Sequence, residues 1–526
     1  MKYDAIVVGA GAGGGVASSL LAQSGAKVLL LEKGEWLRGT ERDHLRNQRY
    51  SRYGVNAGPS LDERREYEGQ EFTPIRGEFS NNASCVGSGT AVYGAQAWRF
   101  HELDFRMATE YGVPKGSSNT DWPIAYRDLE PFYEKVEHAM GVCGNAADYS
   151  HVPVFANPYP MPPMEMGKAG LNFAVGATKL GWKTLRVPLL INSVPRNGRA
   201  ACVKCQNCVG FTCPSDAKNG TQNTMIPFGL ATGNLTLQTG CQVTQILWGS
   251  DGEPKGVRYY DQTGAHDVSA DRIILAGGAV ETARLLLASG TKNDHDQIGR
   301  NLQGHYYSGK TGLFEVDLWD GVGPGVNLAT TRFSHHNEGV LSGGMLADDF
   351  IVSPINMWAW NLPPELPKWG AENKAFFREN YRRIHQIKGP VHEIPNPECR
   401  VKLSTKTDKF GMPIAALFGT THPETVRTAT YMDEKADEWL RASGAIRTWG
   451  GGHVLRMSAG QHQAGSCRMG MDSSLSVVDT SGRVHGYQNL FVSDGSVHPT
   501  NGGFNPVLTI LAMSWRTTKG IIERAS

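Results

Sequence analysis

Apolar and polar positions near the N-terminus follow the pattern of a strand, a helix and a second strand. Residues 5–8 form a short apolar run that suits a strand buried on both faces. Residues 16–24 continue as a helix, and Gly25 suits its left-handed C-terminal cap. Residues 28–31 form a second apolar run, which ends at Glu32. The pattern therefore predicts a β-α-β unit at the start of the chain.

Three glycines between the first strand and the helix, Gly9, Gly11 and Gly14, have G-x-G-x-x-G spacing. The first permits a tight turn, the second lets backbone approach a pyrophosphate, and the third lets the helix pack closely on the strand. Glu32 can accept hydrogen bonds from the ribose hydroxyls of an adenosine, and its charge disfavours a 2′-phosphate. We therefore expect a Rossmann-type site for FAD or NAD, and not for NADP.

The pattern changes between Tyr306 and about Arg447. Residues 310–319, 339–350 and 399–418 alternate like antiparallel strands, with a hairpin turn at Phe410-Gly411-Met412. The stretch that begins near Pro423 and ends at Gly444 has the periodicity of an amphipathic helix. This part of the chain therefore predicts a second unit of the α+β class.

Composition excludes several classes of protein. The 526 residues suffice for two or three domain-sized units, and 40% hydrophobic with 20% charged residues suits a globular chain. Lys plus Arg (52) nearly equals Asp plus Glu (51), so we expect neither nucleic acid nor a membrane surface as a partner. The first residues lack the cationic lead and apolar stretch of a secretory signal, so we expect none, and no apolar run has the about 18 residues that a membrane helix needs. With nine cysteines, the chain is expected in the reducing cytoplasm.

The last seventy residues contain polar side chains at the ends of predicted elements. His462 lies in a glycine-flanked polar loop, and Asp494 follows a strand-like run that includes residues 489–492. Asn505 and Pro506 precede an apolar stretch, which predicts a helix with Asn505 at the N-cap and Pro506 in the first turn.

These features, together with the blocks CVGSGTAVYGAQAWRF (85–100), GGAVETARLLLASG (277–290) and IGRNLQGH (298–305), resemble the glucose–methanol–choline (GMC) family of FAD-dependent oxidoreductases over most of the chain. The segment FNPVLT, which contains Asn505, is similar to pyranose oxidases, bacterial glycoside oxidases and choline oxidase. The resemblance implies that His462 is the general base and that Asn505 hydrogen-bonds the same substrate oxygen. An imidazole is well suited to accept a proton near pH 7, and an amide orients an alcohol without adding charge.

The resemblance also implies the residues that contact FAD. They are Gly9, Gly11, Gly14, Glu32, Gly87, Gly89, Thr90, Val243, Asp494 and Pro506. Some sugar oxidases of the family bind the flavin covalently through a histidine, and the corresponding position here is Val92. We therefore expect FAD to be bound non-covalently.

The implied fold is of the α/β class, a Rossmann-like FAD-binding domain with an α+β substrate domain on an antiparallel sheet, as in p-hydroxybenzoate hydroxylase. We expect the FAD-binding domain in three parts, residues 1–145, 201–305 and 448–526, and the substrate-binding domain at residues 306–447. Residues 146–200, rich in Pro and Met, are expected to form a covering arm that belongs to the substrate domain or to a subunit interface.

Four cysteines, Cys202, Cys205, Cys208 and Cys213, follow the spacing C-x2-C-x2-C-x4-C-P. A bacterial ferredoxin run differs from it by one residue in the last gap. Some GMC-type sugar dehydrogenases have a three-iron cluster in a comparable segment and pass electrons to a cytochrome partner. An iron–sulfur cluster is therefore one alternative, and a compact zinc site is a weaker one. The apolar residues within the run favour packed thiols or a disulfide, and we expect no metal.

Two groups of rings lie outside these motifs. Trp358, Trp360 and Trp369 share a Pro-rich segment, where they would either stack on sugar rings or pack the loop. His335 and His336 are expected to be solvent exposed.

The resemblance implies oxidation of a secondary hydroxyl of a sugar or glycoside to a ketone, with C3 favoured over C2. Hydride would pass to flavin N5 while His462 takes the proton, and O₂ or an external acceptor would reoxidise the flavin. Two alternatives stay open. One is the flavoprotein subunit of a sugar dehydrogenase with an iron–sulfur cluster, and the other is a lyase with idle FAD. The oligomeric state stays open as well.

Overall fold

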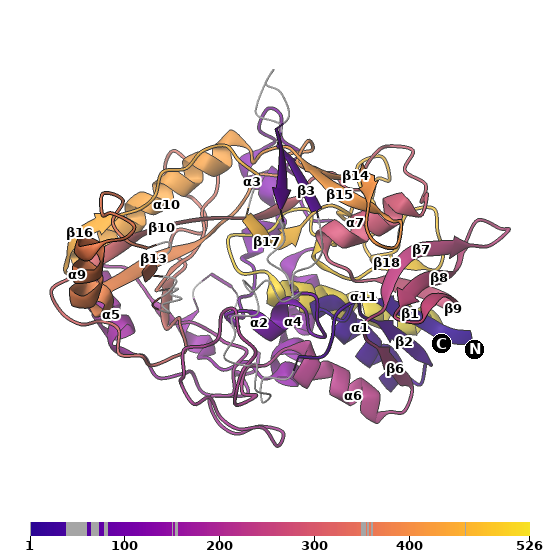
Figure 1. The fold of residues 1–526 in the computed structure, drawn as a ribbon, viewed down its shortest axis with the longest axis horizontal. Coiled ribbons are helices and arrows are strands. Elements are labelled where there is room, and N and C mark those ends of the chain that lie inside the picture. The colour runs from indigo at the N-terminus through magenta and orange to yellow at the C-terminus, as the bar shows by residue number, and fades with distance from the viewer. Residues whose placement is uncertain are drawn as a thin grey trace.

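A parallel sheet flanked by helices forms one half of the molecule, on the right of Figure 1. The computed structural model describes residues 2–37, 60–64, 73–77, 83–149, 151–152, 156–348, 354, 357–358, 361–457 and 459–525. The parallel strands follow the order β6 (Leu235–Gln238), β2 (Val28–Leu31), β1 (Lys2–Val8), β9 (Gly264–Leu275) and β18 (Leu490–Val492). The antiparallel strands β7 (Gln242–Trp248) and β8 (Pro254–Asp261) extend β9. The predicted Rossmann-like part of the fold is thereby confirmed.

The predicted β-α-β unit is present as β1, α1 (Ala12–Gln23) and β2. Gly25 has φ +95°, the left-handed conformation expected after the helix. A Cβ atom on Gly14 would lie 1.8 Å from the carbonyl oxygen of Gly9, so only glycine lets α1 approach the end of β1 this closely. The N-terminus of α1 is therefore held at the edge where the parallel strands end.

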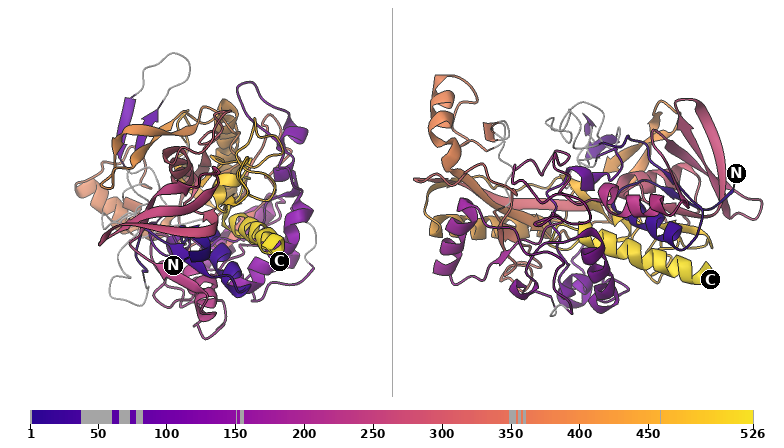
Figure 2. Two further views of the ribbon diagram at one scale, coloured as in Figure 1. Left: turned by 90° about the vertical axis from the view of Figure 1, so that its right-hand side faces the viewer. Right: turned by 90° about the horizontal axis from the view of Figure 1, so that it is seen from below.

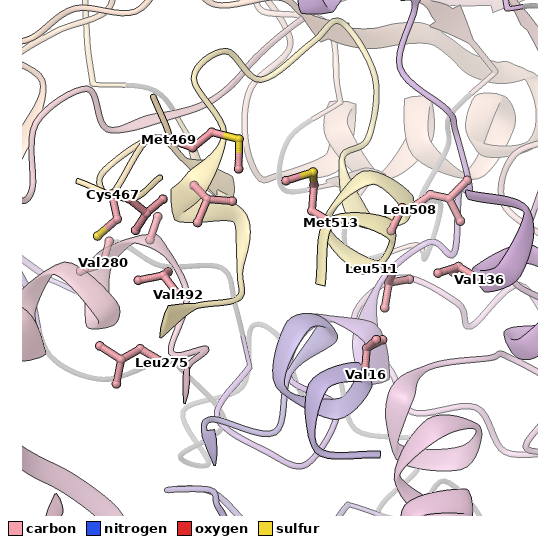
Figure 3. Close-up of a cluster of buried hydrophobic side chains, with 14 of the residues drawn as sticks. Val16, Val136, Leu275, Val280, Cys467, Met469, Val492, Leu508, Leu511 and Met513 are labelled. Atoms are coloured by element: carbon pink, nitrogen blue, oxygen red, sulfur yellow. The ribbon is translucent and has the colours of Figure 1, made fainter. Parts of the chain in front are cut away.

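Helices α1, α4 (Tyr126–Met140) and α11 (Val507–Ala525) form the core behind this sheet (Figure 3). Val16, Val136 and Leu511 meet where the three helices pack, and Leu275 and Val492 belong to the same buried cluster. Helix α11 begins at Val507, one residue later than predicted. Pro506 directly precedes the helix, and the carbonyl of Pro506 accepts from the N–H of Ile510 at 2.9 Å. Packing of α11 fixes the position of the preceding residue, Asn505.

A second, mostly antiparallel sheet forms the other half of the molecule and confirms the predicted α+β unit. Its strands follow the order β16 (Ala445–Trp449), β10 (Gln303–Phe314), β13 (Ile384–Val391), β12 (Leu346–Ala347), β11 (Leu328–Thr330) and β5 (Leu185–Arg186). β17 (Ala459–Ala464) also pairs with β10. Helix α10 (Pro423–Ala442) covers one face of this sheet and packs on α5 (Lys168–Lys179). In the right view of Figure 2, both termini lie at the end of the molecule away from this sheet.

The predicted hairpin at residues 399–418 forms as β14 (Arg400–Thr407) and β15 (Pro413–Phe418), but it does not join the second sheet. It pairs with β3 (Ser60–Arg64) and β4 (Thr73–Gly77) and lies beside α7 (Ala279–Ala288). Arg284 of α7 connects the two, because its guanidinium donates to the carbonyl of Pro413 and to the carboxylate of Asp408, both at 2.6 Å. Strand alternation could not show which sheet the hairpin would join.

The remaining elements are short. They are α2 (Gly89–Val92), α3 (Met107–Tyr111), α6 (Met225–Ala231), α9 (Ala371–Asn380) and the 3₁₀ turns η1 (Glu102–Phe105), η2 (Ala146–Asp148), η3 (Thr221–Asn223), η4 (Tyr381–Arg383) and η5 (Gly495–Val497). None of the helices in the described ranges combines the length and the apolar composition that a bilayer crossing requires.

Candidate active site

A cavity of about 470 Å³ lies between the two halves of the molecule. Its wall includes Val8, Leu31 and Leu275 at the carboxyl ends of three neighbouring parallel strands, where open α/β sheets bind ligands. Most of the predicted site residues line it: Gly9, Gly11, Glu32, Gly89, Thr90, Val243, His462, Asp494, Asn505 and Pro506. Both the first β-α turn and the His462–Asn505 pair therefore face one continuous cavity, as a bound dinucleotide requires.

Gly14 and Gly87 are not among the residues that line this cavity in the described part of the chain. Gly14 acts by close packing of α1, as described above. Gly87 has φ +91°, and a Cβ there would lie 2.3 Å from Oε1 of Gln222. The structure therefore places both glycines behind the wall, where they shape the two segments that face the cavity.

The two carboxylates predicted near the nucleotide hold backbone loops. Glu32 is buried and accepts from the N–H groups of Ala10 and Gly34, each at 2.9 Å. Burial raises the pKa of Glu32 against the lowering effect of these two N–H groups. Asp494 accepts from the N–H of Gly278 at 2.9 Å and from the hydroxyl of Thr282 at 2.6 Å. Each carboxylate thus fixes the backbone of a turn that faces the cavity.

Two histidines meet at the other end of the cavity. Nδ1 of His305 lies 2.9 Å from Nδ1 of His462, and Nε2 of His305 lies 2.8 Å from the carbonyl oxygens of Asn501 and Gly502. Burial lowers the pKa of His305 to about 4, so its ring is neutral near pH 7. A carbonyl can only accept, so the single ring proton of His305 is on Nε2 and its Nδ1 is an acceptor.

This pattern determines which nitrogen of His462 can act as a base. Since Nδ1 of His305 is an acceptor, Nδ1–H of His462 must be the donor between the two rings. Nε2 of a neutral His462 then carries the ring's basic lone pair. It lies 3.4 Å from Nδ2 of Asn505, and both residues line the cavity. The geometry therefore directs the basic nitrogen of His462 to the place where Asn505 presents an N–H donor.

A bulge in β17 places His462. The pairing of β17 with β10 shifts between Gln303–Ala464 and His305–Ala459, which leaves His462 on an irregular segment with φ +58°. The amide of Asn501 holds this segment, because its Nδ2 donates to the carbonyls of His462 at 2.7 Å and of Gly304 at 2.9 Å. The unusual backbone conformation is stabilised by the same loop that fixes the ring of His305.

Asn505 has a second polar neighbour, Tyr307 of β10, whose hydroxyl accepts from Nδ2 of Asn505 at 3.1 Å. Oδ1 of Asn505 is buried and has no hydrogen-bond partner within the described residues. An unpartnered amide oxygen beside a cavity is expected to accept from a molecule that fills it. Sequence reasoning did not identify Tyr307 or His305, although His305 ends one of the blocks quoted above.

The four clustered cysteines lie beside residues 92–94 of the cavity wall. Cys205 is exposed, the other three are half-buried, and all four thiols are free and line a small second cavity. The segment packs on residues 92–94, since the N–H of Gly210 donates to the carbonyl of Val92 at 2.6 Å. Within the described ranges, no three His, Cys, Asp or Glu side chains are arranged to hold a metal ion.

The expectation for His335 is wrong, and that for His336 agrees with the structure. His335 is buried because Nε2–H donates to Asp104 at 3.0 Å and Nδ1 lies 2.9 Å from the hydroxyl of Tyr111, whereas the side chain of His336 is exposed. Trp358 and Trp369 are 45% and 83% exposed and are not among the residues lining the main cavity. Trp360 lies outside the described residues.

The residues of the cavity fit FAD. The N-terminus of α1 would supply N–H groups to a pyrophosphate, and Gly9, Gly11 and Gly89 leave backbone accessible along the wall. Val92 is buried and lines the wall. Fold and site together define a dinucleotide-binding oxidoreductase with an imidazole and an amide at the reactive end.

Comparison with known proteins gives the family. Residues 3–307 and 395–514 match GMC oxidoreductase, and the chain belongs to this family of FAD-binding enzymes. It is 31% identical to 6'''-hydroxyparomomycin C oxidase of Streptomyces lividus over 99% of this chain and 91% of that protein. It is 30% identical to 2-methyl-1,2-propanediol dehydrogenase of Mycolicibacterium austroafricanum, with 100% and 96% covered. An FAD-dependent oxidoreductase from Chaetomium thermophilum has the same fold, with a TM-score of 0.67, 15% identity and 99% of both chains covered. The chain is therefore a GMC oxidoreductase that acts on CH–OH donors.

Proposed function

We propose that this enzyme oxidises a secondary hydroxyl of a sugar-like alcohol, C3 of a glycoside before C2, with His462 as the general base. The observation that carries the proposal is the hydrogen-bond chain from the carbonyls of Asn501 and Gly502 through His305 to His462, which leaves Nε2 of His462 basic beside Asn505. The likeness to a paromomycin-type oxidase supports a substrate of the sugar class.

The residues of the site suit removal of a hydroxyl proton. When bound non-covalently, FAD supplies the acceptor for the hydride of the carbinol carbon. A substrate hydroxyl placed between Asn505 and His462 donates to Nε2 of His462 and accepts from Nδ2 of Asn505, replacing their 3.4 Å contact. His462 takes the proton, and the resulting imidazolium is stabilised because its Nδ1–H already donates to His305.

The remaining predicted contacts take supporting roles in this proposal. Glu32 and the glycines of the first turn hold the adenosine and pyrophosphate, and Val243 and Asp494 line the wall between the two ends. The four clustered cysteines act as packed thiols. O₂ or an external acceptor reoxidises the enzyme.

The test is anaerobic flavin reduction by a methyl glucoside in the wild-type enzyme and in His462→Ala. General-base catalysis typically contributes about 10²–10⁴-fold, so the variant should lose this factor in the limiting reduction rate while it keeps FAD. His266→Ala, a half-exposed histidine on β9 paired with Asp261, is the matched control and should reduce at the normal rate. Normal reduction in His462→Ala would contradict the base assignment.

The same experiment separates the proposal from a lyase, since a wild-type enzyme with idle FAD would show no reduction by any sugar. Mapping the oxidised carbon of the product by NMR tests the choice of C3. A ketone at C2 would correct that choice and leave the base assignment intact.

A further inference from the structure

The wall of the cavity includes Lys388 of β13, the strand that pairs with β10 and its Tyr307. In the antiparallel pairing of β10 with β13, Lys388 lies opposite Gly309 and Pro390 lies opposite Tyr307. Residues that are paired directly, or that are two positions apart, point to the same face of a sheet. Lys388 and Tyr307 therefore share one face.

That face is the one turned to the cavity. Tyr306 and Ile387, which alternate with these residues, pack in the core under α10. Tyr307 reaches Asn505 from the opposite face, and Lys388 lines the same cavity. A Cβ at position 309 would lie 2.4 Å from Cβ of Lys388, so Gly309 leaves room for the lysine side chain beside Tyr307.

The other charged residues in the described wall belong to the nucleotide end of the cavity, and each has a partner within the protein. Glu32 and Asp494 hold backbone N–H groups, and Glu281 lies 3.1 Å from Arg284 and 3.8 Å from Lys33. The ammonium of Lys388, in contrast, makes no hydrogen bond or salt bridge within the described residues. Asp348, which follows β12 and is paired with Lys388 along the backbone, is buried. Its carboxylate accepts from the backbone N–H groups of Asn327 and Leu328.

We propose that Lys388 selects sugar-like alcohols that have an anionic group, a carboxylate or a phosphate, and rejects those that have ammonium groups. The inference rests on the proposed function and names the substrate class for it. Lys388 is half-buried, and substrate and cofactor displace water from the cavity, so its ammonium favours an anionic partner and repels a cation. A hydrogen bond to a charged group should change affinity by about 10- to 100-fold.

The test uses glucosides that share the pyranose ring and carry groups of different charge. At C6 these are methyl glucoside, methyl glucuronide, methyl glucoside 6-phosphate and methyl 6-amino-6-deoxyglucoside, and carboxymethyl glucoside places the charge on the aglycone. The ratio of reduction rate constant to Kd is measured for each in the FAD-loaded enzyme. The wild type should prefer an anionic member over the amino sugar by about 100-fold, and comparison of the glucuronide with the phosphate identifies the anion.

Lys388→Gln should reduce this preference to a few-fold, and Lys388→Glu should reverse it. Lys310→Gln is the matched control, because Lys310 lies one position from Gly309 on the other face and donates to the carbonyl of Gly450 at 2.7 Å. Lys310→Gln should keep the wild-type preference. The inference is overturned if Lys388→Gln keeps it as well, or if the wild type favours the amino sugar.

Binding separates this inference from the proposed function. Calorimetric titration of the loaded His462→Ala variant with methyl glucuronide measures Kd without turnover, and Lys388→Gln in that background should weaken it by about 10-fold or more. If no sugar reduces the wild-type enzyme but this Lys388-dependent affinity is present, the proposed oxidation fails and the anion site stands. If His462→Ala binds methyl glucuronide with the same Kd with and without Lys388→Gln, the anion site is overturned.

Discussion

Replacement of His305 by leucine tests whether this ring fixes the reactive tautomer of His462. Leucine removes the acceptor that faces Nδ1–H of His462 and the donor that faces the carbonyls of Asn501 and Gly502. A hydrogen bond to a charged partner contributes about 1.5–3 kcal/mol and one between neutral groups about 0.5–1.5 kcal/mol. The imidazolium formed during reaction therefore loses about 1–1.5 kcal/mol more than the neutral ring does.

Two measurable effects follow from this difference. The acidic limb of the rate–pH profile should move to lower pH by about one unit, because the neutral form of His462 is favoured. The limiting rate of flavin reduction should fall by about 10- to 100-fold for two reasons. His462 becomes a weaker base, and without His305 its ring proton can occupy either nitrogen, so the form with a basic Nε2 is less populated. Stopped-flow reduction by a methyl glucoside at several pH values measures both.

The matched control is His385→Leu. His385 is also buried, and burial lowers its pKa to about 4, but it packs on Phe173 on the face of β13 away from the cavity. It should lose stability without a change in the pH profile. Folded, FAD-loaded His305→Leu with the wild-type rate and pH profile would refute the tautomer argument.

Two further predictions concern stability. Gly14→Ala should abolish FAD binding or folding, because its Cβ would lie 1.8 Å from the carbonyl oxygen of Gly9; flavin fluorescence of the purified variant checks this, and a normal holoenzyme would contradict it. Burial lowers the pKa of His305, His385 and His498 to about 4 each, so the folded state stays neutral while the unfolded chain takes up protons below pH ~6.5. The contribution of these histidines to the free energy of unfolding is therefore complete above this pH and falls by about 2 kcal/mol per histidine by pH 5. The pH dependence of Tm measures this loss, and a Tm unchanged between pH 7 and 5 would contradict it.

Local rules were sufficient for the parts of the fold that depend on neighbouring residues. The apolar run 28–31 is strand β2 with the same limits, and Gly25 and Gly444 have the left-handed conformations expected after their helices. The hairpin at residues 399–418 shows where such rules end. Its strands were predicted, but they pair with β3 and β4 and are contacted by Arg284 of α7, all far earlier in the chain.

Buried polar residues were the hardest to predict, because their role depends on distant partners. His335 has the sequence surroundings of a surface loop, yet it is buried. Its Nε2–H donates to Asp104, and its Nδ1 accepts from the hydroxyl of Tyr111. Lys388 belongs to a strand pattern in which a lysine normally faces water. Only the pairing of β10 with β13 and the packing of α10 on the other face direct it to the cavity.

The reactive pair shows the same limit at the level of single atoms. A motif can identify His462 as a candidate base, but it cannot say which ring nitrogen is basic. That depends on His305, 157 residues away, and the protonation of His305 depends in turn on two carbonyls of the loop before α11. Since that loop also places Asn505, the proposed mechanism assigns orientation of the substrate hydroxyl and placement of the base to the same segment. A change in the Asn501–Gly502 backbone should therefore affect proton removal and substrate orientation together, although neither residue is titratable.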